Sequence, residues 1–421
     1  MSLEFNLISS ENYCTYITDG THGTHSNQET GKYLLSAKDI LDGNVHIKDN
    51  SRIISEEDFN KIHKNYKLEN YDVLLTVAGT IGRTAIIKNY QNNYTFQRSV
   101  AIFKTNDKIK SLWLYYYLNS PIGKQIIKSL SKGTTQLILP LKDLRNLEIP
   151  VPKNISDQKK ILSILTDIDK KIEINKRINQ NLEEQLETLY NSFFVYYDDF
   201  LKEDLKECEI GLIPKEWSLL SLGEVTTKIN EKVGSNDYKV FSAVNTGNLI
   251  LSEEYFDKQV YSKSIEKYIV VKQKEFAYNP ARINIGSIGR NNFDFDGCVS
   301  PVYVAFKVEE GYENFMNMYI KSNRFNQWVI TLSSGSVRQT LNYNDFSIIK
   351  IAYPPKELIN KFNTIYESYY EVINYNKSVI NNLEKIRDLL LPKLMSGEID
   401  VSKINYDLII ATFYFYSEII F

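Results

Sequence analysis

One helical pattern occurs twice in this chain of 421 residues. The segment Asn175–Glu183, with its N-K and N-L-E sequences, returns 201 positions later as Asn376–Glu384. Around both segments, apolar residues recur at alternating spacings of four and three, which is the heptad seam of a coiled coil. A repeat of about half the chain predicts two similar modules, each ending in a long helix. The first seam comprises Ile161, Leu165, Ile168, Ile172, Asn175, Asn179, Leu182, Leu186, Leu189 and Phe193, and the second comprises Phe362, Tyr366, Tyr369, Ile373, Asn376, Ile380, Leu383, Arg387, Leu390 and Leu394.

Prolines and turn residues divide the chain around these helices. Pro150 and Pro152 precede the first helix, and Pro354-Pro355 precede the second. Within the second, Pro392 is expected to kink or end the helix and Gly397 to stop it. About 38 residues at ~1.5 Å each make a rod of roughly 55–60 Å, which needs a partner along its length. We predict a first domain over 1–152, a first helix over 153–197, a linker and second domain over 198–354, a second helix over 355–400 and a tail over 401–421.

The segments outside the helices have the pattern of mixed α/β globules. Short apolar runs such as Val73–Val77 and Ser99–Phe103 are separated by Gly, Asn and Asp turns, and a helix is expected from Ser111 to about Leu130. The fold class is therefore α/β, with two globules on one repeated frame and a long helix after each. Matching residues recur while the sequence between them diverges: Ser36-Ala37 with Ser242-Ala243, Gly43-Asn44 with Gly247-Asn248, and Gly133, Leu139 and Asp143 with Gly335, Leu341 and Asp345.

The composition narrows the class of protein. A formal net charge of −2 argues against a free-standing nucleic-acid-binding protein, although it is compatible with a local basic face. The three cysteines are far apart and form no C-x-x-C, so we expect structural thiols in a reducing, cytoplasmic compartment and no metal site. The N-terminal residues lack the pattern of a signal peptide, and no apolar run reaches the ~18 residues of a membrane span. We interpret the apolar tail Leu408–Phe421 as a packing strand or a read-through tail.

A glycine loop of the pattern G-[TS]-I-G-R occurs in both globules, at Gly79–Arg83 and Gly286–Arg290. It differs from the G-x-x-x-x-G-K-[ST] of nucleotide-hydrolysing P-loops, so the pattern does not indicate ATP hydrolysis. Two interpretations stay open. The loop is a β-turn that places Arg83 and Arg290 beside a polyanion, or it is a purely structural turn.

Three further polar segments are candidate contact sites. Asp19–His22, followed by His25, represents either turn chemistry or a base or phosphate contact, since no nucleophile elbow or metal-ligand spacing accompanies it. The loops Ser131–Gln136 and Ser333–Gln339 stand at equivalent places in the repeat and combine small hydroxyls, a basic side chain and Gln. Such loops suit a DNA groove, because Gln can pair with adenine and Arg with guanine.

Two asparagines, Asn175 and Asn376, occupy equivalent positions in the apolar seams. A buried Asn often fixes the register of a coiled coil. We expect either an Asn–Asn pair across an antiparallel helix contact or two amides that face solvent.

Further motifs occur in order along the chain: Asp19-Gly20-Thr21-His22, Gly133-Thr134-Thr135-Gln136, Leu144–Pro152 leading to Gln158–Ile161, Pro214…Trp217…Leu222-Gly223-Glu224 and Leu391–Ile399. Together with the two glycine loops, this ordered set resembles the specificity (S, HsdS-type) subunits of Type I restriction–modification systems, as far as about Val401. The first globule lacks the P-x-x-W opening of the second, and the tail after Val401 has no counterpart in the family pattern. Methyltransferase, nuclease and Walker motifs are not recognisable in the chain.

This resemblance implies a non-catalytic DNA-recognition subunit. Each globule would be a target recognition domain that reads one half of a bipartite double-stranded DNA target. The two helices would pack antiparallel as a spacer with pseudo-two-fold symmetry and dock two methyltransferase (M) subunits, and motor-nuclease (R) subunits would join the assembly. The partners, and not this chain, would use S-adenosylmethionine for adenine methylation and ATP with Mg²⁺ for cleavage. The alternative is a coiled-coil scaffold that binds protein and not DNA, which explains the helices and the charge but not two divergent globules on one frame.

The candidate contact residues lie in the loops and seams described above, and none is assigned a catalytic or metal-binding role. Phosphate contacts are predicted for Arg83, Lys132, Arg290 and Arg338. Base contacts are predicted for Thr21, His22, Gln97, Arg98, Thr135 and Gln136 in the first domain, and for Asn279, Arg282, Asn284 and Gln339 in the second. The helix and subunit interface is predicted to include Ile168, Ile172, Asn175, Leu182, Tyr369, Ile373, Asn376 and Leu383.

Overall fold

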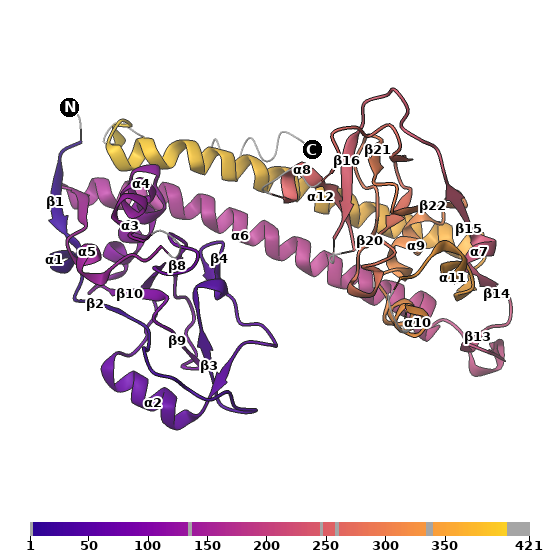
Figure 1. The fold of residues 1–421 in the computed structure, drawn as a ribbon, viewed down its shortest axis with the longest axis horizontal. Helices are drawn as coiled ribbons and strands as arrows, with labels where there is room; N and C mark the ends of the chain where they lie inside the picture. Colours follow the sequence, from indigo (N-terminus) through magenta and orange to yellow (C-terminus); the bar gives the residue numbers. More distant parts are fainter. Residues whose placement is uncertain (1–2, 134–136, 245–246, 257–260, 334–339, 402–421) are drawn as a thin grey trace. The chain divides into compact units, whose positions relative to one another are not determined.

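The computed structural model describes residues 3–133, 137–244, 247–256, 261–333 and 340–401. The chain forms two compact units, one of residues 1–175 with 378–421 and one of residues 176–377. Each unit joins a globule to one end of both long helices, α6 and α12 (Figure 1). The five-part division expected from the sequence stays a prediction. The apolar tail interpreted from the sequence lies outside the described residues.

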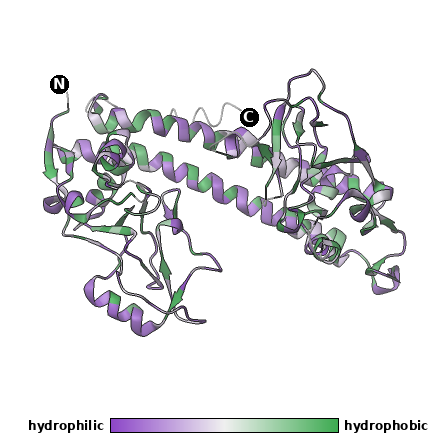
Figure 2. Ribbon diagram, viewed as in Figure 1, coloured by the Kyte–Doolittle hydropathy of each residue, from purple (hydrophilic) through white to green (hydrophobic). Residues whose placement is uncertain are grey.

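The two long helices lie close to where the repeat predicts them. Helix α6 spans Ile155–Asn191 over 37 residues and runs into a π-helical turn, Ser192–Tyr196. Helix α12 spans Lys356–Ser396 over 41 residues and is followed by Gly397 at a φ of +76°, a left-handed conformation that ends helices well. Pro392 was expected to kink or end this helix. It does not end it, because α12 continues through Pro392 for one more turn, and a kink at Pro392 stays a prediction. Figure 2 shows hydrophilic and hydrophobic residues alternating along both helices, as a one-sided seam requires.

Within each unit the helices run antiparallel. In the first unit, Lys160 Nζ lies 3.4 Å from the carbonyl oxygen of Val401, and an Arg387 guanidinium nitrogen lies 3.2 Å from Asp169 Oδ1, so positions rise along α6 as they fall along α12. In the second unit, the rings of Tyr190 and Phe362 lie 6.4 Å apart. The seams are buried in both units, as the heptad pattern predicts.

Asn175 and Asn376 were expected to pair with each other or to face solvent, and neither expectation is correct. Both asparagines are buried, and they do not bond to each other. Asn376 donates from Nδ2 to Asn179 Oδ1 at 2.8 Å, and Asn179 donates to the carbonyl oxygen of Ile373 at 3.2 Å. Asn175 is 5% exposed, and its Nδ2 finds no hydrogen-bond partner among the described residues. The repeat supplies the reason: the position equivalent to Asn179 in the second helix is Ile380, which offers no side-chain acceptor.

The first globule is a set of small sheets packed on helices. Its sheets have the strand orders β1-β11, β2-β10-β7-β8, β6-β3-β9 and β4-β5. The strands are β1 Phe5–Ser9, β2 Tyr16–Asp19, β3 Lys32–Leu35, β4 Ile40–Leu41, β5 Asn44–Val45, β6 Ile53–Ile54, β7 Val73–Thr76, β8 Thr84–Ile86, β9 Tyr94–Phe96, β10 Val100–Lys104 and β11 Glu148–Pro152. The helices are α1 Ser10–Tyr13, α2 Glu56–Asn65, α3 Lys108–Asn119, α4 Pro121–Leu130 and α5 Leu141–Arg145, with a short 3₁₀ turn at Ala37–Asp39.

The single helix expected from Ser111 to about Leu130 is in fact two helices, α3 and α4. Ser120 adopts an extended conformation between them, and its side chain accepts a hydrogen bond from Gly123 N at 3.1 Å as the N-cap of α4. Pro121 is the cause, because the residue before a proline avoids the helical conformation and proline itself suits the first helical position.

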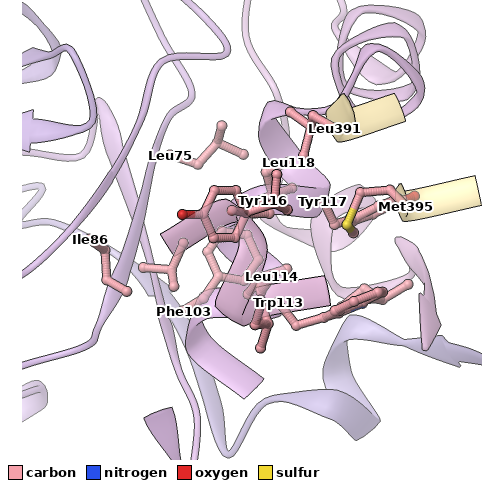
Figure 3. Packing of buried hydrophobic residues seen from close by; sticks show 14 of the residues in the cluster. Leu75, Ile86, Phe103, Trp113, Leu114, Tyr116, Tyr117, Leu118, Leu391 and Met395 are labelled. Atoms are coloured by element: carbon pink, nitrogen blue, oxygen red, sulfur yellow. The ribbon is translucent and has the colours of Figure 1, made fainter. Parts of the chain in front are cut away.

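The core of the first globule continues into the helical ends. Figure 3 shows Phe103 of β10 and Trp113, Tyr116 and Tyr117 of α3 in one cluster with α12 side chains. Three polar tips in this cluster are satisfied: Trp113 Nε1 donates to Pro150 O at 2.8 Å, Tyr117 to Glu148 O at 2.8 Å and Tyr116 to Asp169 Oδ2 at 2.6 Å. The globule and its helices therefore share one core.

The second globule has the sheets β12-β13, β14-β23, β15-β22-β19-β20 and β17-β16-β21-β18. The strands are β12 Leu205–Cys208, β13 Gly211–Pro214, β14 Ser218–Ser221, β15 Thr226–Ile229, β16 Lys239–Ala243, β17 Leu249–Leu251, β18 Ile269–Val271, β19 Phe276–Tyr278, β20 Ile288–Arg290, β21 Gly297–Val299, β22 Val304–Val308 and β23 Lys350–Tyr353. The helices are α7 Leu222–Val225, α8 Ser252–Tyr255, α9 Glu313–Tyr319, α10 Asn323–Ser333 and α11 Tyr343–Ser347, with 3₁₀ turns at Lys202–Asp204 and, as η4, Ile283–Ile285.

The strand pairings confirm the internal repeat. Strands β1 and β11 pair antiparallel as β14 and β23 do, and β3 and β9 pair parallel as β16 and β21 do. The order β2-β10-β7-β8 corresponds to β15-β22-β19-β20. A buried hydrogen bond also recurs, because Tyr319 donates to Lys350 O at 3.2 Å where Tyr117 donates to Glu148 O. The mixed α/β fold class with two long antiparallel helices is thus confirmed.

The two seam asparagines at repeat-equivalent positions should respond differently to substitution. In Asn376→Ala, the buried Oδ1 of Asn179 loses its donor, and we expect the free energy of unfolding to fall by about 1–3 kcal/mol. In Asn175→Leu, a buried amide without a partner is removed, and we expect stability to stay the same or to rise. Urea denaturation of both variants beside the parent chain measures the difference, and equal losses in both would contradict it.

Candidate nucleic-acid interface

Loops that are distant in sequence meet at one end of the four-stranded sheet of the first globule. The register pairs Asp19 with Ala101, Val100 with Thr76 and Leu75 with Thr84. The end of β2, the start of β10, the end of β7 and the start of β8 therefore lie together. The loops that leave these strands carry the first-domain candidates Thr21, His22, Arg83, Gln97 and Arg98.

Four of the predicted base-contacting residues form one cluster at this end. Thr21 N donates to Phe96 O at 2.8 Å, and Arg98 N donates to Thr21 O at 3.1 Å, which brings Thr21, His22, Gln97 and Arg98 side by side. The side chain of His22 is 64% exposed, and its Nε2 lies 2.9 Å from Asp19 Oδ2. The side chain of Arg98 is also exposed, so this cluster offers polar groups to a ligand.

His25 contacts this cluster, and Arg52 and Asp58 contact His25. Thr21 Oγ1 lies 3.0 Å from His25 Nε2, and His25 Nδ1 lies 3.3 Å from Asp58 Oδ2. Arg52 donates a hydrogen bond to the carbonyl oxygen of His25. Sequence reasoning did not identify Arg52 or Asp58, because neither belongs to a motif and only the fold brings them to His25.

Gly20 allows the close approach of the two chain segments. Its N–H donates to Val100 O at 3.0 Å, and a Cβ at this position would overlap the carbonyl oxygens of Phe96 and Gln97. A glycine is required here for lack of space and not for backbone conformation.

Arg83 and Lys132 lie in two further loops at the same end of the sheet. The β7–β8 turn carries Arg83, and Leu139 N donates to Val77 O at 2.9 Å, which attaches the loop after α4 to that turn. The Lys132 side chain is 67% exposed, and its Nζ lies 2.5 Å from Asp143 Oδ2. The predicted contacts Thr135 and Gln136 lie outside the described residues.

The second globule has a corresponding sheet end. Its register pairs Ile229 with Ala305, Val304 with Tyr278 and Tyr278 with Ile288, so the β19–β20 loop lies at this end. That loop, 279–287, holds Asn279, Arg282 and Asn284, with Arg282 exposed. Leu341 N, in the segment after α10, donates a hydrogen bond to Pro280 O of this loop at 3.0 Å. This bond corresponds to the one from Leu139 N to Val77 O in the first globule. Arg338 and Gln339 lie outside the described residues.

The matching motifs predicted that Arg290 and Arg83 occupy equivalent positions, but they do not. Arg83 precedes β8, whereas Arg290 is the last residue of β20. Phe276 pairs with Arg290 where Val73 pairs with Ile86, so Arg290 stands in the place of the buried Ile86. The β19–β20 loop is longer than the β7–β8 loop, and Arg282 lies in it.

The Arg290 guanidinium is buried inside the second unit and has partners there. Arg290 is 4% exposed, and it donates to Asn292 Oδ1 and Asn314 Oδ1, both at 2.6 Å. The guanidinium carbon lies 5.9 Å from the rings of Tyr366 and Tyr370 of α12. Burial raises the pKa of the Tyr370 hydroxyl, and Arg290 opposes that shift. A phosphate contact by Arg290 stays a prediction, and it would require the loss of both hydrogen bonds.

The opposite end of the second sheet is unsuited to a polyanion. A hollow of about 600 Å³ opens there, between the start of β15, the end of β22 and the start of β19. Five glutamates and two lysines line it: Glu224, Glu275, Glu309, Glu310, Glu313, Lys274 and Lys307. Burial raises the pKa of Glu275. Charge therefore favours the loop-bearing end for contact with nucleic acid.

The predicted helix-interface residues all lie in the seams. Six of them are buried, namely Ile168, Ile172, Asn175, Ile373, Asn376 and Leu383. Leu182 and Tyr369 are partly buried against the core of the second unit. These positions hold the helices together, and their availability to another subunit stays a prediction.

The described part of the chain, residues 3–401 without the four internal gaps, has neither a metal-ligand cluster nor a candidate membrane-spanning helix. It contains no group of three or more His, Cys, Asp or Glu side chains arranged to hold a metal ion. Among these same residues, no helix is both long and apolar enough to cross a membrane.

Comparison with known proteins gives a consistent result. Residues 18–184 match the Type I restriction modification DNA specificity domain. The Type I restriction enzyme MjaIX specificity subunit of Methanocaldococcus jannaschii is 27% identical over 353 residues, which cover 79% of this chain and 78% of that protein. The HindI specificity subunit of Haemophilus influenzae is 25% identical over 404 residues, which cover 76% of this chain and 84% of that protein.

A solved structure has the same fold. The S subunit of a Type I restriction–modification system from M. genitalium superposes with a TM-score of 0.54 at 16% sequence identity, covering 93% of this chain and 96% of that one. At this level of identity the similarity concerns the fold alone.

Substitution of Gly20 should disturb the candidate site through the backbone. We expect Gly20→Ala to lower the free energy of unfolding by about 1–3 kcal/mol, because the added methyl group meets backbone carbonyls that cannot move independently. Hydrogen exchange of the Thr21 and Arg98 amides should become faster, since both donate across the Gly20 approach.

Gly79→Ala is the matched control for this prediction. Gly79 has a φ of +76° and open space around it, so we expect a cost of only about 1–2 kcal/mol from the left-handed conformation. The Thr21 and Arg98 amides should keep their protection. Loss of protection in both variants would contradict the role given to Gly20.

Proposed function

We propose that this chain, which is related to the specificity subunits of Type I restriction–modification systems, recognises DNA for such a system. Each globule would be a target recognition domain for one half of a bipartite site. The observation that carries this proposal is the pair of equivalent sheet ends. The two ends share one strand frame, yet the residues on their loops differ. A constant frame with variable loops suits a protein that reads two unlike sequences.

Phosphate and base contacts would have separate roles. Contacts to phosphate position a protein on the duplex, and contacts to base edges read the sequence. The sequence predicted a base contact for Arg282 and a phosphate contact for Arg290. Because the Arg290 guanidinium is buried with two partners and Arg282 is exposed, we propose Arg282 for phosphate in its place, together with Arg83 and Lys132. The cluster of Thr21, His22, Gln97 and Arg98 would contact base edges of the first half-site. Asn279 and Asn284 would read the second half-site. Half-sites about one helical turn of DNA apart, ~34–36 Å, suit such a two-domain reader.

The proposed role of the long helices is to set the spacing of the half-sites and to dock two M subunits. The M subunits would methylate adenine with S-adenosylmethionine, and R subunits would use ATP and Mg²⁺ to cleave DNA. This chain would bind none of these cofactors and catalyse neither reaction. The proposed compartment is the cytoplasm. A formal net charge of −2 fits a subunit that shares DNA binding with its partners.

Arg282 and Arg290 provide a test of the assignment at the second sheet end. We expect Arg282→Ala to reduce the slope of log affinity for cognate DNA against log salt by about 1, because one phosphate contact is lost. Its free energy of unfolding should stay within about 0.5 kcal/mol of the parent, since the side chain is exposed. Fluorescence anisotropy across a salt series, on the target found by methylome sequencing, measures the slope.

Arg290→Ala is the matched arginine variant. We expect it to lower the free energy of unfolding by about 1–3 kcal/mol, because the Asn292 and Asn314 oxygens lose their donors. Its salt slope should equal that of the parent complex. A lower slope in Arg290→Ala with an unchanged slope in Arg282→Ala would reverse the assignment.

The proposal as a whole is tested with purified subunits. We expect gel shifts to show sequence-specific binding when the chain is combined with its M partner, because the complex supplies DNA contacts that this near-neutral chain lacks. The chain alone should show weak binding or none. The absence of binding in both cases would favour the coiled-coil scaffold, which binds protein and not DNA.

A further inference from the structure

Two exposed aliphatic side chains lie at the loop-bearing sheet end of the second globule. Ile285 is 60% exposed in the β19–β20 loop, and Val302 is 67% exposed in the turn before β22. The register of β22, β19 and β20 brings these two loops to the same end of the sheet. Exposed aliphatic side chains are common singly, but these two accompany Arg282 at a surface for which charge favours nucleic acid.

The loop that carries Ile285 is held rigidly. Asn279 N donates to Ser287 O at 3.0 Å, and Ser287 Oγ donates to Ala243 O at 2.6 Å, so both ends of the loop are fixed. Between them, Ile283 is 1% exposed and anchors the loop in the core. Gly286 adopts a φ of +82°, which turns the chain immediately after Ile285. Ile285 therefore points outward from a preformed loop, and little conformational entropy would be lost on contact.

Val302 is presented in a similar way. It belongs to the turn Ser300-Pro301-Val302-Tyr303, which is closed by Tyr303 N donating to Ser300 O at 2.9 Å. Proline in the second position restricts this turn before binding. Tyr303, the next residue, packs against a buried cluster and fixes the turn to the sheet.

The first globule uses the corresponding isoleucine differently. The strand register, in which Arg290 stands in the place of Ile86, makes Ile285 the counterpart of Ile81, although the matching motifs pair Ile81 with Ile288. Ile81 precedes Gly82, at a φ of +91°, as Ile285 precedes Gly286. Ile81, however, packs against the core of the first unit. An exposed isoleucine at this position is thus a feature of the second globule alone, and it lies in one of the loops that differ between the two globules.

Only one group in the DNA major groove is a favourable contact for an aliphatic side chain. In the major groove, base pairs present hydrogen-bond donors and acceptors, and the apolar group among them is the C5-methyl of thymine. An aliphatic side chain set against polar base edges would remove them from water without a replacement hydrogen bond.

We propose that Ile285 and Val302 recognise thymine in the second half-site by contacting its C5-methyl group in the major groove, with Arg282 on the adjacent backbone. This inference rests on the proposed DNA-recognition function and adds a chemical specificity to one of its two domains. Ile285 and Val302 are specificity-determining residues that make no hydrogen bond to the base.

Replacement of thymine by deoxyuridine removes the methyl group and leaves the base-pairing edge intact, so it tests this contact directly. With the chain in complex with its M partner, we expect at least one such replacement in the second half-site to weaken binding about fourfold, the effect of one buried methyl group. In the Ile285→Ala, Val302→Ala double variant, thymine and deoxyuridine duplexes should bind equally. Fluorescence anisotropy at fixed salt measures both ratios.

Two controls accompany this experiment. Leu212 is 55% exposed in the separate β12-β13 sheet, so Leu212→Ala should keep the parent ratio between thymine and deoxyuridine. Replacements in the first half-site should have the same effect on parent and double variant. Thermal unfolding should give the same midpoint for all variants, because the substituted side chains are exposed.

Several results would overturn the proposal. These are a parent ratio of one at every thymine, an unchanged ratio in the double variant, or a second half-site without thymine on either strand. Weaker DNA binding with no thymine preference would indicate a wedge between base steps instead. Loss of M-subunit binding in the double variant would assign the side chains to a protein interface. Failure of the parent complex to bind the unmodified target would instead refute the proposed function itself.

Discussion

Burial of the two seams against each other is the interaction on which the rest of the structure depends. Helices of 37 and 41 residues have no other means of staying folded along their length than packing of an apolar face. The seams do more than join two helices, because each end of the pair is built into the core of a globule. Phe194, in the π-helical turn that follows α6, lies 5.0 Å from Phe362 of α12 and 5.9 Å from Trp217 of the second globule, measured between rings. A globule separated from its helices would expose this core.

Among the described residues, the polar contacts that join each globule to its helices differ between the two units. In the first unit, Asp169 of α6 accepts from Tyr116 of the globule and from Arg387 of α12. In the second unit, Asn314 of the globule accepts from Arg290 and donates to Asn363 of α12 at 3.1 Å. The apolar frame is therefore common to both halves, whereas these polar contacts to the helices differ between the halves and must be satisfied locally. This difference allows the halves to diverge without loss of the frame.

Much of the architecture could be predicted from local patterns. The seam spacing and its repeat predict both long helices within a few residues, and Gly397 ends α12 as expected. The repeat also predicts one frame for both globules. The differences from the predicted helices concern two prolines, whose effect on a helix depends on their position in it. Pro392 lies near the end of α12, where the loss of one backbone hydrogen bond is tolerated, and Pro121 divides what periodicity alone would join.

The candidate site shows a similar division. The sequence identifies Thr21, Gln97 and Arg98 as polar loop residues, but only the pairing of β2 with β10 brings residues 76 positions apart into contact. The matching G-[TS]-I-G-R motifs make Arg83 and Arg290 equivalent in sequence. The longer β19–β20 loop, however, shifts the strand register, and Arg290 is buried.

The sequence by itself determined the helices, their repeat and the class of fold, because side-chain periodicity and turn residues act over a few neighbouring positions. The tertiary structure alone decided which loops share a sheet end, which arginine is exposed and which asparagine finds a partner. Those outcomes depend on strand register and on packing between distant segments, where one residue of shift turns a side chain from solvent into the core.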